Sequence, residues 1–154
     1  MPETQQTMDL MAGEIFELYK LIAMARSRRT TPEDLSELEF LTLDALYREE
    51  QPLTVGEVQK RVGVVPAQMS RIIRALEEQG GKGFLASKIN AEDRRRIDIS
   101  LTDSGRAAYE DYRSIRIRSM QEVLSVLPPP DRSHFMRILG QIRAAFEARM
   151  SSGS

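Results

Sequence analysis

The sequence contains no cysteine and one histidine, His134. The absence of cysteine excludes disulfides, thiolate metal sites and redox sensing through cysteine, and it fits a reducing compartment. A single histidine leaves no room for a histidine-based metal cluster or a catalytic histidine pair. The simplest interpretation of His134 is a solvated residue near a helix start. A histidine that titrates near neutral pH or contacts an anionic ligand is the alternative.

Long apolar runs are missing too. The segment MPETQQTMDLMAGEIFELYK begins acidic and polar and holds no apolar core of signal-peptide length. No later run approaches the ~20 residues of a membrane span. Nor does the sequence offer a nucleophile-base pair, a metal-ligand spacing or a glycine-rich phosphate loop. We therefore expect a soluble, cytoplasmic protein that makes no membrane contact, is not an enzyme and carries no cofactor or metal.

The 154 residues suit one compact domain, or one domain with an extension, that buries roughly 70 % of its unfolded surface. Charge is divided unevenly along the chain. Residues 60–106 hold ten Lys or Arg against six Asp or Glu, a net +4, while the rest holds twelve against seventeen, a net −5. This asymmetry is modest, and a solvated surface explains it as well as a nucleic-acid partner does.

Apolar residues recur at three- and four-residue steps near both ends of the chain, which predicts amphipathic helices. One covers residues 8–25 and ends in the polar stretch RSRRTTPED. A long helix follows Thr102 as its cap, PPPD breaks it, and Asp131 is expected to cap the last helix, after which SSGS frays. Helices this apolar around a small domain need a partner surface, and packing within one chain is the alternative.

Two capping boxes, Ser36 with Glu39 and Thr54 with Glu57, predict helix starts in the middle of the chain. The stretch EEQPL between them is expected to be a turn. The second box opens a short helix, 55–62, and a tight turn containing Gly follows it. A short helix, a tight turn and a further helix form the helix-turn-helix pattern, whose second helix fits the major groove of DNA.

The second helix of this motif begins at Pro66, where a missing N–H costs nothing. One face is apolar at helical spacing and is expected to be buried: Met69, Ile72, Ile73 and Leu76. The other faces carry Pro66, Ala67, Gln68, Ser70, Arg71 and Arg74. Gln pairs with adenine and Arg with guanine, so Gln68 and Arg71 suit bases, while Ser70 and Arg74 suit phosphates. A solvated polar helix face is the alternative.

The next segments, 84–89 and 97–101, are short and β-branched or alternating, and predict a hairpin joined by NAEDRRR. A hairpin in this position reaches the neighbouring minor groove, where an arginine meets strong negative potential. Arg95 is the best candidate for insertion. We expect Asp93 to hold its guanidinium, and Arg94 and Arg96 to meet phosphates. A loop of weak surface ion pairs is the alternative.

The segments LSELEFLTLDAL, LTVGEVQKRVGVVPAQMSRIIRALEEQG and DRRRIDISLTDSGR resemble the multiple-antibiotic-resistance regulator (MarR) family of winged-helix transcription factors. The family's wing pattern, Asp-x-Arg followed by Leu-Thr-x-x-Gly, is met by Asp93, Arg95, Leu101, Thr102 and Gly105. The resemblance covers about residues 35–113. The segment GGKGFLASKIN is longer than usual in the family, and Ala86 and Ser87 stand where arginines are common. The first wing strand is therefore expected to bulge or shift.

The elements and the resemblance together imply a mainly α fold with a small β-wing. Its parts are an N-terminal dimerisation helix (1–34), a winged helix-turn-helix (35–105), C-terminal dimerisation helices (106–150) and a frayed tail (151–154). The resemblance implies a homodimeric, cytoplasmic regulator, usually a repressor, that binds a pseudo-palindromic operator in double-stranded DNA.

The family reading places the recognition helix, about 66–79, in the major groove through Gln68, Ser70 and Arg71. It places the wing tip, about 90–96, in the minor groove through Arg95. A small aromatic or phenolic effector that releases the DNA is a further implication of the resemblance. The alternative function is a winged-helix module for protein contact without DNA binding.

Overall fold

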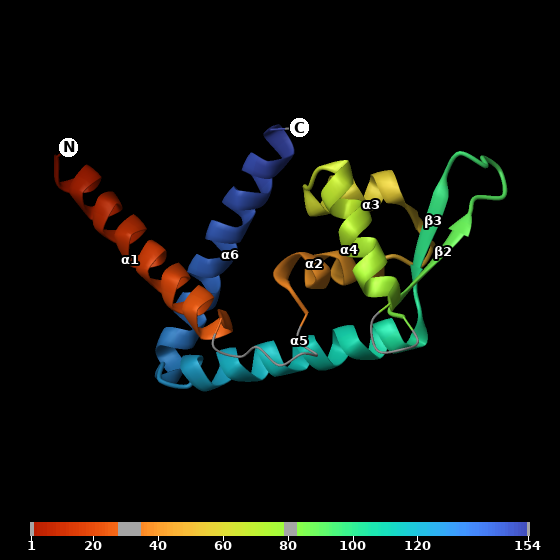
Figure 1. Cartoon of the computed structure of the whole chain (residues 1–154). Helices are drawn as coiled ribbons and strands as arrows, with labels where there is room; N and C mark the ends of the chain where they lie inside the picture. Colours follow the sequence, from red (N-terminus) through yellow and green to blue (C-terminus); the bar gives the residue numbers. More distant parts are fainter. Residues whose placement is uncertain (1, 28–34, 79–82, 154) are drawn as a thin grey trace. The chain divides into compact units, whose positions relative to one another are not determined.

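The structure, a computed structural model, describes residues 2–27, 35–78 and 83–153. In chain order the elements are α1 (Pro2–Ser27), α2 (Glu37–Tyr47), β1 (Leu53–Thr54), α3 (Val55–Val62), α4 (Pro66–Glu78), β2 (Leu85–Ile89), β3 (Ile97–Leu101), α5 (Asp103–Leu124) and α6 (Pro129–Ser152) (Figure 1). The chain divides into two compact units, residues 1–112 and 113–154. The predicted order of elements is confirmed, with β1 as an addition.

Some of the expectations concern residues that lie outside the described ranges. The expected end of the first helix in RSRRTTPED lies mostly outside the described residues, as do position 79 of the recognition helix and the start of the long segment before the wing. Within the described ranges, no helix combines the length and the apolar character that a membrane crossing requires.

Capping boxes fix the starts of α2 and α3, as predicted. The Ser36 hydroxyl accepts the N–H of Glu39 (3.2 Å), and the Glu39 carboxylate accepts the N–H of Ser36 (2.8 Å). Thr54 and Glu57 make the same two bonds, at 3.3 and 2.7 Å. Each box satisfies N–H groups that a helix start leaves without a partner inside the helix. Gly63 closes α3 at φ 77°, a left-handed conformation that glycine adopts without steric cost.

Replacing Thr54 with alanine removes the hydroxyl that accepts at the start of α3. The free energy of unfolding is expected to fall by about 1 kcal/mol. Urea unfolding at one fixed protein concentration measures the change. Thr54→Ser keeps the acceptor and should stay within about 0.5 kcal/mol of the parent. An alanine variant as stable as the parent would show that this box does not contribute.

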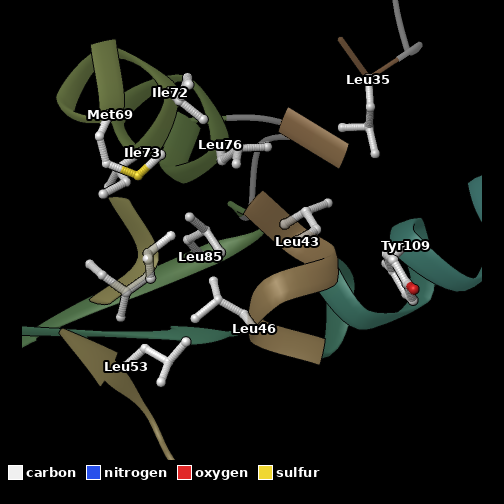
Figure 2. Close-up of a cluster of buried hydrophobic side chains, with 12 residues drawn as sticks. Leu35, Leu43, Leu46, Leu53, Met69, Ile72, Ile73, Leu76, Leu85 and Tyr109 are labelled. Atoms are coloured by element: carbon white, nitrogen blue, oxygen red, sulfur yellow. The ribbon is translucent and has the colours of Figure 1, made fainter. Parts of the chain in front are cut away.

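The core of the first unit forms where α2, α3, α4 and the strands meet. Met69, Ile72, Ile73 and Leu76 of α4 are buried, as their spacing predicts. Figure 2 shows these side chains gathered with Leu43 and Leu46 of α2 and Leu85 of β2. Because this face of α4 is fixed against the core, the rotation of the helix is fixed as well. Its polar side chains must therefore point away from the core.

The strands form one antiparallel sheet in the order β1-β3-β2. Leu85 pairs with Leu101 at one end of the hairpin and Ile89 with Ile97 at the other. The register is continuous over the described residues, so the expected bulge in the first wing strand is wrong. The expected shift of the strand stays a prediction. β1 pairs with β3 through Leu53 and Ile99. Sequence reasoning assigned the segment around Leu53 to a turn, because two residues are too short to show alternation.

The base of the hairpin is tied to the start of α5. The Thr102 hydroxyl accepts the N–H of Gly105 (3.0 Å), which confirms Thr102 as the cap. The same hydroxyl donates to the carbonyl oxygen of Gly83 (2.8 Å). The Thr102 N–H donates to the carbonyl oxygen of Phe84 (3.1 Å), and the Phe84 N–H donates to that of Leu76 in α4 (2.7 Å). These bonds join the hairpin to both neighbouring helices.

Gly105 explains the glycine of the wing pattern. A Cβ built on Gly105 would lie 2.0 Å from the carbonyl oxygen of Phe84 and 2.8 Å from its carbonyl carbon. Real Cβ atoms do not approach a backbone atom this closely. The first turn of α5 can therefore lie against Phe84 only because position 105 has no side chain.

The start of α5 is anchored on α2 by Tyr109, whose exposed fraction is 2 %. Its ring stacks on that of Phe40, with centroids 5.4 Å apart and planes 10° from parallel. Its hydroxyl donates to Oδ1 of Asp44 (2.5 Å). A buried tyrosine hydroxyl needs such a partner, and the pair fixes the start of α5 within the first unit.

α6 begins differently from the prediction. Its N-cap is Pro128, no side chain caps it, and prolines occupy its first turn. Asp131 was expected to be the cap and instead lies within that first turn. Proline suits the first helical positions because their N–H groups have no partner inside the helix, so PPPD starts a helix as well as ending one. The helix continues to Ser152, into the segment assigned to a frayed tail.

The outer helices expose many large apolar side chains. On α1 the exposed fractions include 67 % for Leu10, 59 % for Phe16 and 67 % for Tyr19. On α6 Phe146 is 63 % exposed and Met150 is 74 % exposed. Apolar faces of this extent are unusual on a monomer and mark an interaction surface.

Candidate nucleic-acid interface

The polar face of α4 is available to a ligand. All of its predicted contact residues are exposed: Pro66, Ala67, Gln68, Ser70, Arg71 and Arg74. Within the described part of the chain, the side chains of Gln68, Arg71 and Arg74 have no hydrogen-bond or ion-pair partner. The Ser70 hydroxyl donates to the carbonyl oxygen of Pro66 (3.1 Å). Its single donor is occupied in this conformation, and only its acceptor lone pairs remain.

The wing tip, residues 90–96, carries its arginines on the outside. The side chains of Arg94 and Arg95 are exposed and have no partner among the residues that the structure covers. The expected contact between Asp93 and the Arg95 guanidinium is wrong. Oδ1 of Asp93 accepts the backbone N–H of Arg95 (3.0 Å), and Oδ2 lies 3.5 Å from Nε of Arg96. Asp93 faces back into its own turn, so it shapes the loop and leaves the Arg95 side chain free.

A groove runs between α4 and the hairpin and is named the α4-wing groove. Residues of α3 close one side of it. Its polar lining is Thr54, Glu57, Lys60, Ser70, Arg74, Glu77, Ser87, Arg95 and Arg96. The structure thus brings Ser70, Arg74, Arg95 and Arg96 to one groove, whereas Gln68, Arg71 and Arg94 lie outside it. Lys60 was not predicted as a contact. Its place on α3 depends on tertiary packing, and no local pattern in the sequence indicates it.

Two carboxylates in this α4-wing groove already have partners. The pKa of Glu57 lies below its ordinary value because its carboxylate accepts the backbone N–H of Thr54 and also interacts with the Thr54 hydroxyl. Arg61 and Arg96 lower that pKa further by their charge. Glu77 accepts a hydrogen bond from the Ser87 hydroxyl. The cations Lys60, Arg74 and Arg95 have no such partners among the residues that the structure describes, so an anion entering the groove meets positive charge that these residues do not neutralise.

Other kinds of site find no support in the described residues. No group of three His, Asp or Glu side chains there has the geometry to hold a metal ion. His134 is exposed on α6, as expected for a solvated histidine.

Two packed helices joined by a tight turn, followed by a hairpin with an exposed basic tip, define a winged helix-turn-helix protein. The sequence profile of the MarR family matches residues 35–97, which span α2 to the start of β3. This part of the chain is therefore similar to the MarR family.

Proteins similar to this chain over most of its length have the same kind of fold or are named as transcriptional regulators. The chain is 27 % identical over 143 residues to the HTH-type transcriptional repressor MdtR of Bacillus subtilis, covering 88 % of this chain and 90 % of MdtR. The structure of YusO from Bacillus subtilis has a TM-score of 0.71 at 24 % identity, covering 89 % of this chain and 96 % of YusO. Streptococcus pneumoniae FabT, solved in complex with DNA, has a TM-score of 0.68 at 18 % identity, covering 93 % and 97 %. The family and MdtR are transcriptional regulators, not enzymes.

Proposed function

We propose that this chain is a sequence-specific transcriptional repressor that binds double-stranded DNA as a homodimer in the cytoplasm. One observation carries the proposal. Ser70 and Arg74 of α4 line the same groove as Arg95 of the wing tip. Among the described residues, the cations Lys60, Arg74 and Arg95 of this groove have no hydrogen-bond or ion-pair partner. A duplex has the matching form, because a helix fills its major groove while a wing reaches the adjacent minor groove.

Each contact residue follows from its chemistry. Gln68 and Arg71 read base edges at the start of α4, where Pro66 and Ala67 allow close approach. Ser70 accepts from a base amino group, because its donor is occupied and a phosphate offers only acceptors. Lys60 and Arg74 bind phosphates from the α4-wing groove.

The wing tip contributes the second set of contacts. Arg95 enters the minor groove, where its exposed guanidinium meets the strongest negative potential over A/T-rich DNA. Arg94 and Arg96 bind the flanking phosphates. Asp93 makes no contact with DNA in this proposal and acts by holding the backbone of the tip.

The dimer follows from the outer helices. Their exposed apolar faces need a cover, and a second copy of the chain supplies a matching one. Charge supports this occupant, because residues 1–27 hold four acidic against two basic side chains, while residues 113–154 hold seven basic against three acidic ones. We therefore assign residues 1–34 and 106–150 to dimerisation and 35–105 to DNA binding.

Selection of bound sequences from a random duplex pool tests the function directly. The purified full chain is expected to enrich a pseudo-palindrome whose half-sites lie about one helical turn apart. Enrichment of a single half-site would contradict the dimeric arrangement. No enrichment at any salt concentration would overturn the function.

The groove assignment is tested by two variants on the selected duplex. Arg71→Ala is expected to lose about 1–3 kcal/mol of discrimination at one base position per half-site. Arg95→Ala is expected to weaken binding most where the flanks are A/T-rich. Competition binding with single-base variants measures both effects. Arg48→Ala removes the same charge at the C-cap of α2, outside the α4-wing groove, and should leave both preferences unchanged. Unchanged base preferences in Arg71→Ala would refute the major-groove assignment.

A further inference from the structure

The wing tip is closed by the side chain of Asn90, which uses both ends of its amide group. Oδ1 accepts the N–H groups of Glu92 and Asp93, each at 2.9 Å. Nδ2 donates to both carboxylate oxygens of Asp98 in β3, each at 3.0 Å. Asn90 and Asp98 are both half-buried. The amide thus joins the start of the loop to its own turn and to the strand that follows.

Backbone bonds complete this closure. The Asn90 N–H donates to the carbonyl oxygen of Arg96, and the Arg96 N–H donates to that of Asp93, both at 2.9 Å. Arg95 takes part only through its N–H, which donates to Asp93. The groups that hold the loop are therefore separate from the guanidinium that we assign to the minor groove.

The hydrogen bonds of the acidic residues in this segment indicate that they hold the shape of the loop. Asp93 and Asp98 lie in or beside a loop that is proposed to approach phosphates, where negative charge by itself weakens binding. Both carboxylates accept hydrogen bonds that hold the loop, and bonds to an ionised acceptor are stronger than neutral ones. A loop that is ordered before binding loses less conformational freedom when it binds.

We infer that Asn90 and Asp98 are positioning residues that fix the wing tip in the free protein and so aim Arg95 at the minor groove. The inference rests on the proposed DNA-binding function and names the pair that sets its minor-groove contact. Simple electrostatics predicts that DNA affinity rises when a carboxylate near the phosphates is removed, and the inference predicts the opposite for Asp98. Removing the negative charge of Asp98 should weaken DNA binding.

The test compares Asn90→Ala and Asp98→Ala with Glu92→Ala in the full chain at one salt concentration. Glu92→Ala is the matched control, because it removes an exposed carboxylate of the same loop that bonds to no residue in the described part of the chain. On an A/T-flanked operator, Asn90→Ala and Asp98→Ala are expected to bind about five- to tenfold more weakly, with a smaller preference over a G/C-flanked operator. Glu92→Ala is expected to bind equally well or more tightly.

Two further measurements distinguish a loss of order in the wing tip from a loss of folding of the whole chain. Backbone NMR order parameters of residues 91–96 in the free parent are expected near the rigid value of about 0.85, and below about 0.6 in Asn90→Ala. The double variant Asn90→Asp with Asp98→Asn keeps the net charge and an amide-carboxylate pair. It should regain most of the affinity and the flank preference.

The outcomes separate this inference from the proposed function. If the parent binds no duplex, the proposed function fails and the inference fails with it. If the parent binds but Asp98→Ala behaves like Glu92→Ala, the inference alone is overturned. A rigid tip in Asn90→Ala, or a double variant no better than the single ones, also overturns it.

Discussion

Raising the salt concentration from about 50 to about 200 mM should weaken binding to the selected operator by about 10³- to 10⁵-fold. This range assumes that the dimer neutralises roughly six to ten phosphates, each of which releases condensed cations into solution. Lys60, Arg74, Arg94 and Arg96 provide contacts of this number when counted over two subunits. Fluorescence anisotropy titrations at several salt concentrations give the slope.

A variant relates this slope to the α4-wing groove. Lys60→Ala should reduce the slope of log affinity against log salt by about 2, one phosphate per subunit, without changing base preference. The Arg48→Ala control should leave the slope unchanged. A flat salt dependence of the parent would instead favour a winged helix used for protein contact, because such a module needs no phosphate contacts.

Replacing Gly105 with alanine is expected to lower the free energy of unfolding by about 3 kcal/mol, at the upper end of what overpacking costs. The added Cβ would meet the Phe84 carbonyl oxygen at 2.0 Å. This neighbour is backbone, and the Thr102 N–H already donates to it, so it cannot move without breaking the base of the wing. Thermal and urea unfolding at one protein concentration measure the loss.

Gly56→Ala is the control for this effect. Gly56 lies in α3 of the same unit, and a Cβ there would meet nothing within 4 Å. Its stability should change by less than about 1 kcal/mol, in either direction. A Gly105→Ala variant as stable as Gly56→Ala would mean that the start of α5 can move away from Phe84 at little cost.

Local chemistry allowed much of this fold to be read from the sequence. A capping box joins residues three apart, so Ser36 with Glu39 and Thr54 with Glu57 could be recognised without knowing what packs around them. The same holds for the left-handed Gly63 and for the apolar stripe of α4. The hairpin 85–101 was recognisable from alternation on both sides of a polar loop.

The features that depend on tertiary contacts were either missed or assigned wrongly from the sequence. β1 exists only because Leu53 pairs with Ile99 across the sheet. Lys60 reaches the α4-wing groove through the packing of α3, and the choice of Arg96 over Arg95 as the partner of Asp93 depends on how the loop turns. The contact residues of α4 and the wing tip were predicted by type and order, and their roles remain predictions.

The wing is fastened at both ends, and this has a mechanical consequence. At its base, Thr102 and Phe84 bind it to the first turn of α5 and to α4. At its far end, Asn90 and Asp98 lock the loop to β3. A hairpin held at both ends in this way is expected to move together with the first turn of α5. We therefore expect that a tilt of this turn would displace the arginines at the wing tip.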